Sequence, residues 1–209
     1  MRAKRISVLF LLFVALSCSK GNTTDEAYYS FPEYGLQLFV PNGWYPQDAK
    51  EYIINTVPGV DPKKVEKLSY HEASEKAGFL FLLTRRPPEI KGREPAAIGF
   101  TVFELSHEEI NLPIDSLGKI RRTQVLNIYQ QDSVTSPIKV IHIGEFPAVE
   151  WEANGIPAQG VPVHIISYSI LNGGTEYFIY AFAPIDNFEE YRGTIDEFVR
   201  KIKVKSREN

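Results

Sequence analysis

The stretch VPVHIISYSILNGGTEYFIYAFA, residues 161–183, decides the fold class. Its two halves, Val161 to Leu171 and Glu176 to Ala183, are rich in β-branched and aromatic residues, and Asn172-Gly173-Gly174 separates them. Two such runs around a glycine-rich turn are typical of a β-hairpin. We therefore predict two long antiparallel neighbours in this part of the chain.

A third strand precedes this hairpin. Residues 148–153 alternate apolar and polar side chains, and Asn154-Gly155 follows them as a strong turn signal. Together the three segments predict an antiparallel meander, with a further strand from Ile138 to Ile143 before it.

The chain after the hairpin predicts the best-defined helix, from about Asp186 to Lys201. Its apolar residues recur at spacings of three and four, and this stripe comprises Phe188, Tyr191, Ile195, Phe198 and Ile202. A stripe of this kind must be buried, and the meander offers the surface that can bury it.

The N-terminal half carries shorter signals. Strands are predicted at residues 35–40, 79–84 and 96–105, and the continuous apolar run of 79–84 suits a central strand covered on both faces. Helices are predicted at residues 48–56, 61–76 and 113–130. Asp61-Pro62 suits the start of the second helix, and Gly78 suits a left-handed cap at its end.

These elements predict an α+β fold. About seven strands, mostly antiparallel, and three main helices are expected, with the helices burying their apolar stripes on the sheet. Because the central strand needs cover on both faces, we expect an α/β/α sandwich with helices on both faces of the sheet. Residues 28–209 are expected to form this single globular domain.

The first eighteen residues have the features of a secretory signal peptide. Arg2, Lys4 and Arg5 precede an apolar run from Ile6 to Leu16, and small Ser17 stands before Cys18. The run is too short for a membrane-spanning helix, which needs about 20 residues, so a permanent span is the weaker interpretation. We expect residues 1–17 to be removed.

Leu16-Ser17-Cys18 resembles the lipobox of bacterial lipoproteins, although Ala15 stands where that motif most often has Leu. The resemblance implies that a diacylglyceryl group is attached to Cys18 and that the precursor is cut before it. The alternative is an ordinary signal peptide that contains a cysteine. Cys18 is the only cysteine, which excludes an intramolecular disulfide and a thiolate metal site.

The charge balance limits the partners. Removal of residues 1–17 takes three of the 23 basic side chains and no acidic ones, which leaves 20 against 26 and a net charge of −6. This argues against nucleic acid as a partner and against broad electrostatic binding to anionic lipid. Residues 18–27, which include the expected lipidated cysteine, are polar and non-periodic and are interpreted as a tether.

The order of motifs resembles the PsbP-like superfamily. The opening stretch Gly35-Leu-Gln-Leu-Phe-Val-Pro-Asn-Gly-Trp44 is similar to its opening, and Gly144-Glu-Phe-Pro-Ala148 is similar to the step before its meander. Tyr177 to Pro184, followed by a final helix, is similar to its ending. The resemblance implies an α/β/α sandwich with binding and accessory roles and no shared chemistry. The matched residues are interpreted as structural, with Trp44 packed on the sheet.

No nucleophile elbow, phosphate-binding loop or zinc-protease helix is present in the sequence. The best catalytic or metal-binding candidates are Glu150 and Glu152, which alternation places on one strand face, with His164 on the next strand. The favoured alternative is that both glutamates form the polar face of a half-exposed strand, with Val149 and Trp151 inward.

Two further groups were considered as sites. His107 with Glu108 and Glu109 could hold a cation, but a solvated turn explains them as well. The aromatic residues that follow the tether, Tyr28, Tyr29 and Phe31, could contact a partner or could form the first strand.

We therefore expect a lipid-anchored accessory or binding protein of the bacterial cell envelope, without catalytic activity and without a cofactor. Its partners are expected to be the membrane, through the lipid, and an envelope protein. Ser19 after the cysteine favours the outer membrane over the inner one. The alternatives are an envelope enzyme or metal-binding protein that uses the Glu/His site, and a carrier of a small apolar ligand.

Overall fold

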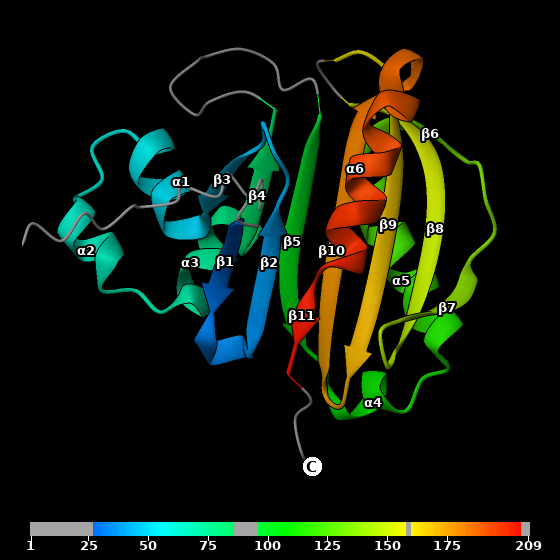
Figure 1. The fold of residues 1–209 in the computed structure, drawn as a ribbon, viewed down its shortest axis with the longest axis horizontal. Helices are drawn as coiled ribbons and strands as arrows, with labels where there is room; N and C mark the ends of the chain where they lie inside the picture. Colours follow the sequence, from blue (N-terminus) through cyan, green and yellow to red (C-terminus); the bar gives the residue numbers. More distant parts are fainter. Residues whose placement is uncertain (1–26, 86–95, 158–159, 206–209) are drawn as a thin grey trace, which may run out of the picture.

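An antiparallel sheet of eight strands forms the centre of the molecule (Figure 1). The structure is a computed structural model that describes residues 27–85, 96–157 and 160–205. The strand order is β3-β4-β5-β10-β9-β8-β6, and β7 pairs with β8 on the same side as β6. These strands are β3 (Tyr45–Asp48), β4 (Phe81–Thr84), β5 (Ala97–Glu104), β6 (Tyr129–Val134), β7 (Lys139–Ile143), β8 (Phe146–Pro157), β9 (Val163–Asn172) and β10 (Thr175–Pro184).

The predicted hairpin is confirmed. β9 and β10 pair in antiparallel register from Asn172 opposite Thr175 to Val163 opposite Pro184, and Gly173 takes the positive φ of 61° that this tight turn requires. β8 completes the meander on the other side of β9. The α+β fold with a large antiparallel sheet is therefore confirmed, and residues 161–183 supply two of its central strands.

The predicted turn at Asn154-Gly155 is wrong. Both residues lie inside β8, where Asn154 pairs with His164 and Gly155 pairs with Val163. Gly155 has a different use here, because a Cβ atom at this position would lie 2.6 Å from the Tyr129 ring. The glycine thus makes room for an aromatic ring on the sheet and does not end the strand.

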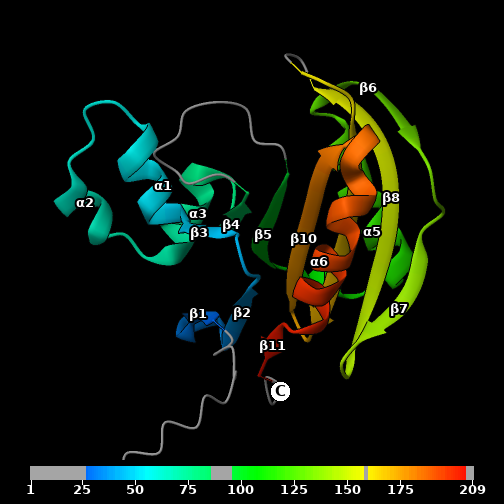
Figure 2. The same cartoon turned by 45° about the horizontal axis from the view of Figure 1, so that its top comes forward.

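A second, three-stranded sheet has the order β1-β2-β11 and consists of β1 (Ala27–Phe31), β2 (Leu36–Val40) and β11 (Lys203–Val204). A single turn of 3-10 helix, η1 (Pro32–Tyr34), joins the first two. Phe31, Leu36 and Leu38 are buried in one cluster with Phe81 and Phe100 of the large sheet. The small sheet and α6 (Phe188–Arg200) thereby cover the same face of the large one (Figures 1 and 2).

The other face of the large sheet is covered by α5 (Ile114–Leu126). Leu126 of α5 packs on Trp151, Ala153 and Ile165, which are buried on β8 and β9. Helices on both faces agree with the predicted sandwich. The remaining helices are α1 (Ala49–Thr56), α2 (Pro62–Glu66), α3 (Tyr70–Ala77), α4 (His107–Ile110) and the 3-10 turn η2 (Ile185–Asn187).

The helix predicted over residues 61–76 is in fact two helices. Asp61 begins α2 as expected, but Ser69 starts a new helix, because its side chain accepts from the Glu72 amide and Glu72 caps Ser69 in return. Gly78 then ends α3 in the left-handed conformation, with φ 81°, as predicted.

Two other expectations are corrected, and one is confirmed. The helix predicted to reach residue 130 ends at Leu126, which leaves room for β6. β3 was not predicted, and it moves the apolar strand β4 to a place one strand in from the edge. Trp44 packs in the main core, as expected of a structural residue.

In the part of the chain that the structure describes, no helix is long and apolar enough to cross a membrane. The signal peptide 1–17, the lipidation of Cys18 and residues 18–26 of the tether lie outside the described residues, whereas Ala27, the last residue of the predicted tether, begins β1.

Candidate functional site

The face of β8 beneath α6 carries the polar residues that the sequence singled out. Glu150, Glu152 and Asn154 alternate along this face, and the strand register sets His164 of β9 directly opposite Asn154. The opposite face of β8 buries Val149 and Trp151. The prediction that these two residues point inward is therefore confirmed.

Glu152 is the centre of a closed polar cluster. Arg192 of α6 donates from Nη2 and Nη1 to its two carboxylate oxygens at 2.7 and 3.3 Å, and His164 Nε2 lies 2.8 Å from Oε2. The side chains of Glu152 and His164 are only 13% and 15% exposed. The cluster therefore joins the last helix to the middle of the meander with little access for solvent.

Both ring nitrogens of His164 face oxygen atoms. Nδ1 lies 2.7 Å from Asn154 Oδ1, and the Phe188 ring packs against the imidazole with a centroid distance of 4.2 Å. Next to the carboxylate, Nε2 acts as the donor. Nδ1 then either donates to the Asn154 oxygen as part of an imidazolium ion or accepts from the Asn154 amide group. His164 is thus oriented from both sides.

The charge state of Glu152 follows from this geometry. Burial acts to raise the pKa of Glu152, but the hydrogen bonds from Arg192 and His164 outweigh it and hold the pKa below its usual value. The same contact raises the pKa of Arg192. A carboxylate that remains ionised in this way is a poor general acid, for which a raised pKa is needed.

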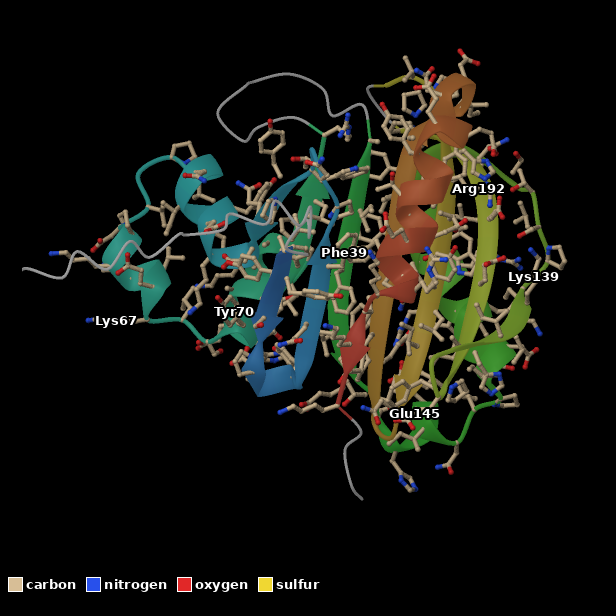
Figure 3. The ribbon with its side chains drawn as sticks, viewed as in Figure 1. Phe39, Lys67, Tyr70, Lys139, Glu145 and Arg192 are labelled. Atoms are coloured by element: carbon tan, nitrogen blue, oxygen red, sulfur yellow. The ribbon has the colours of Figure 1, made fainter. Side chains whose placement is uncertain are left out.

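Glu150 is not part of the cluster. It accepts a hydrogen bond at 2.9 Å from Lys139, its register partner on β7, and this contact raises the pKa of Lys139. Figure 3 labels both cations that meet these carboxylates, Arg192 and Lys139. The structure therefore brings together two of the three predicted residues, Glu152 and His164, and directs the third to the edge of the sheet.

The structure assigns no metal site to these residues. Within residues 27–85, 96–157 and 160–205, no group of three His, Cys, Asp or Glu side chains could hold a metal ion. Of the second candidate group, Glu109 accepts from the Ser106 amide at the start of α4 and pairs with Arg121 at 3.2 Å. His107 and Glu108 are exposed on the same short helix.

Arg192 and Asn154 complete the cluster, but sequence reasoning missed both. Arg192 lies one helical turn after Phe188, at the border of the apolar stripe of α6. A cation at the border of a buried stripe was the available sign that this residue could reach a carboxylate on the sheet below. Asn154 was assigned to a turn, which concealed its place beside Glu152 on the same strand face.

A hollow of about 320 Å³ adjoins this cluster. Asn154 is the link, since it lines the hollow and also contacts His164. The other lining residues are Asp132, Ser133, Gly155, Ile156, Pro162 and Ile185. The hollow thus combines one carboxylate, from Asp132, with neutral polar and apolar groups, and such a lining suits the binding of a group from another molecule.

The aromatic residues after the tether divide between two faces of β1. Phe31 is fully buried, and Tyr29 donates to the Asp48 carboxylate at 2.5 Å. Tyr28 lies on the opposite face, 5.9 Å from Phe39 between ring centroids. A partner contact by this group stays a prediction, and only Tyr28 of the three is on an outer face.

The element order, the two-faced sheet and the final helix together define a PsbP-like α+β fold. No family model matches the chain, and no curated protein matches its sequence. The solution structure of cyanobacterial PsbP (CyanoP) from Synechocystis sp. PCC 6803 is similar, with a TM-score of 0.56 at 14% identity, over 90% of this chain and 98% of that chain.

A second similar structure is LpqN of Mycobacterium tuberculosis, which is described as involved in cell envelope biogenesis. It has a TM-score of 0.50 at 9% identity, over 88% of this chain and 87% of that one. The Saccharomyces cerevisiae Ran-binding protein Mog1p has a TM-score of 0.48 at 14% identity, over 86% and 95% of the two chains. At these identities the likenesses to CyanoP and LpqN establish the fold alone.

Proposed function

We propose that this chain is a lipid-anchored, non-catalytic binding module of the bacterial cell envelope. The closed cluster around Glu152 carries the non-catalytic part of the proposal. Its carboxylate is engaged by Arg192 and His164, and the other candidate, Glu150, is engaged by Lys139. The polar side chains that an enzyme would need are thus used to hold α6 and β7 on the sheet.

The anchoring part rests on the first eighteen residues. The signal peptide pattern ends at the only cysteine, and a thiol in an exported protein is a liability unless it is modified. A single acyl chain binds a membrane marginally, whereas two or more anchor a protein stably. A lipobox cysteine carries at least two, which suits permanent attachment.

The envelope location has separate support. The fold is shared with LpqN, whose description places that protein in cell envelope biogenesis. For the present chain, export followed by attachment at Cys18 leads to the envelope, and Ser19 favours the outer membrane. We propose a protein partner in the envelope as the object of binding.

The anchor is tested with the full chain expressed in a bacterium with labelled palmitate. The chain is expected to incorporate label and to remain in the membrane fraction, whereas Cys18→Ala is expected to lose both. Ser19→Thr is the matched control, since it lies after the expected cut and keeps the thiol. A Cys18→Ala protein that stays in the membrane fraction would refute the anchor.

The binding role is tested by cross-linking in intact cells and by identification of the captured proteins. The expected result is one envelope protein that is recovered repeatedly with the wild-type chain. Recovery of the same background proteins with wild type and with an unrelated lipoprotein of similar size would contradict it.

A carrier of a small apolar ligand is a second candidate, because one hollow favours it. About 300 Å³ of space lies between the β7–β8 turn and β11, and it meets the size that small-ligand sites need. Its apolar lining is Ile143, Phe146, Ile170, Ile202 and Val204. The test is native mass spectrometry of protein purified from cells. A bound ligand of lipid size that is present in the wild-type protein and absent from Ile170→Trp would support the carrier.

A further inference from the structure

The last strand of the chain is amphipathic and cationic. Residues 201–205 read Lys-Ile-Lys-Val-Lys, and an extended chain directs alternate side chains to opposite faces. Ile202 and Val204 pack against the main core. Within β11 this alternation places Lys203 on the outer face of the small sheet, and Lys205 follows the strand. Lys201 lies in the turn that ends α6 and reaches the same face, where its ammonium group lies over the Phe39 ring. We call these three residues the lysine row.

Aromatic rings lie beneath two of these lysines. Lys201 Nζ lies 4.2 Å from the centroid of the Phe39 ring, and Lys203 Nζ lies 3.8 Å from that of Tyr28. Tyr28 and Phe39 are register partners on β1 and β2. The outer face of the small sheet thus combines cations with aromatic rings, and Figures 1 and 2 show its three strands side by side.

A hollow of about 390 Å³ opens on this same face. Lys203 and Lys205 line it together with the hydroxyl of Ser30 and the amide of Gln37, and the register sets Ser30, Gln37 and Lys203 in one row across the three strands. Two lysine side chains with neutral donors beside them make the hollow suitable for an anionic group. The remaining lining residues are Pro32, Gly35, Leu36 and Val204.

The local charge of this face differs in sign from that of the whole chain. Within residues 27–85, 96–157 and 160–205, one acidic side chain forms an ion pair with the lysine row, Glu197 of α6, which lies 2.8 Å from Lys201. Glu33 stands at the border of the face, in η1. Lys203 and Lys205 are exposed, so the described residues of this face carry a net positive charge on a chain that is acidic overall.

The position of the proposed anchor places this face near lipid. β1 begins at Ala27, and the residues from Cys18 to Glu26 can extend over at most about 30 Å. That segment contains Lys20, Asp25 and Glu26, so it adds little charge of its own. Because the small sheet begins where the tether ends, its local concentration at the bilayer is high, and weak contacts suffice to hold it there.

We propose that the outer face of β1, β2 and β11 docks on the anionic phospholipid surface of the membrane in which Cys18 is anchored. The inference rests on the proposed lipid anchor. Lys203 and Lys205 contact headgroup phosphates over the hollow, and Tyr28 lies at the level of the interface, which tyrosine favours. The domain therefore lies on the bilayer with the outer face of the small sheet toward the lipid.

The test uses the chain purified from cell membranes and returned to vesicles. An amine-reactive acetylating reagent modifies lysines according to their access, and mass spectrometry reads each lysine separately. Vesicles of phosphatidylcholine alone are compared with vesicles in which phosphatidylglycerol makes up roughly a third of the lipid. Lys63 and Lys64, which are exposed on α2, are the internal reference.

The proposal expects labelling of Lys203 and Lys205 to fall by about fivefold on the anionic vesicles, while labelling of Lys63 and Lys64 is unchanged. At about 1 M salt, where the screening length is about 3 Å, the protection is expected to disappear. Equal labelling on the two kinds of vesicle overturns the proposal, and so does equal protection of Lys63 and Lys64.

Charge reversal gives an independent measurement. Lys203→Glu with Lys205→Glu is expected to remove the protection of Lys201, whereas Lys63→Glu with Lys64→Glu is expected to leave it intact. Both pairs are exposed, so neither variant disturbs the core. Protection of the lysine row in intact cells but on neither kind of vesicle would mean that the face binds a protein, and it would overturn the lipid assignment.

The two proposals fail in different ways. The intact mass of the same sample reports whether Cys18 is acylated. An acylated chain with unprotected lysines keeps the anchor and overturns the docking face. A chain without acyl groups whose lysines are protected on anionic vesicles overturns the anchor and keeps the lipid-binding face.

Discussion

The phenol ring of Tyr180 on β10 lies over Gly99, its register partner on β5, so closely that a Cβ atom at Gly99 would be 2.3 Å from the ring Cζ. The absence of a side chain at Gly99 thus creates the place for an aromatic ring in the middle of the sheet. Tyr129 over Gly155 repeats the arrangement near the edge of the sheet. In cross-strand glycine–aromatic pairs of this kind, the ring shields the backbone at the glycine from solvent, which the missing side chain would otherwise expose.

Gly99→Ala is expected to destabilise the fold by about 1–3 kcal/mol, because the added methyl group displaces the Tyr180 ring. The measurement is urea unfolding. The double variant with Tyr180→Ala should show less than the sum of the two single effects. Gly193→Ala is the control, since Gly193 is an exposed helix residue with open space around it. There alanine should stabilise by about 0.5–1 kcal/mol.

Arg121→Ala is expected to cost about 3–5 kcal/mol at neutral pH, because it leaves the Glu176 carboxylate charged and unpaired. Arg121 Nε donates to Glu176 Oε2 at 2.7 Å, and Glu176 is fully buried. Glu176→Gln should cost less, since it removes the buried charge itself. Equal costs for the two variants would contradict this account.

The loss in Arg121→Ala is expected to shrink as the pH falls. Burial raises the pKa of Glu176 above its ordinary value, although Arg121 acts to lower it. Because the pKa is higher in the folded state than in the unfolded state, protonation of Glu176 favours the fold. Without the arginine, protonation at acid pH relieves the unpaired charge. Unfolding curves of wild type and variant between about pH 7 and 5 test this, and a pH-independent difference would refute it.

Glu152→Gln is expected to lower the free energy of unfolding by about 1.5–3 kcal/mol at neutral pH, because hydrogen bonds to a charged group are lost. The folded pKa of Glu152 lies below its ordinary value of 4.5, so its stabilisation is present above that pH and is lost as the pH falls through the folded pKa. The difference between wild type and variant should therefore vanish in acid. Glu150→Gln, which loses only an exposed pair with Lys139, is the control and should change stability by less than about 1 kcal/mol.

Asp48→Ala is expected to cost about 2–3 kcal/mol, more than an ordinary helix cap. Asp48 Oδ1 accepts from the Glu51 amide at the start of α1, and Oδ2 accepts from the hydroxyls of Tyr29 and Tyr70. Ser69→Ala removes the exposed cap of α3 alone and should cost about 1 kcal/mol. Thermal unfolding of both variants compares them, and equal losses would show that the tyrosines contribute nothing.

Much of the sheet could be predicted because its signals are local. Asn172-Gly173-Gly174 fixes one hairpin, and the apolar stripe of α6 follows from five residues at helical spacing. β3 and β6 could not be found in this way. Tyr45–Asp48 is only four residues long and contains a proline, and its pairing with β4 depends on contacts with residues 81–84.

The candidate site was predicted in part for the same reason. Alternation along β8 placed Glu150 and Glu152 on one face, and hairpin pairing brought His164 to that face. The arginine or lysine that pairs with each glutamate comes from outside β8 and β9, Arg192 from a later helix and Lys139 from an earlier strand. The pairing of a charged residue with a distant one depends on packing, which no pattern in the sequence specifies.

The pairing of the long strand β8 bears on the tendency of the protein to aggregate with copies of itself. Two short strands, β6 and β7, cover its outer edge one after the other, and the pairing of β6 shifts register near Tyr129. Between β6 and β7, the amides of Thr135 and Ser136 both donate to the Glu152 carbonyl. No long, straight row of unpaired amides therefore lines this edge in the part of the chain that the structure describes. Proteins confined to a membrane plane meet one another often, and an interrupted edge of this kind disfavours the strand-to-strand aggregation that such crowding would promote.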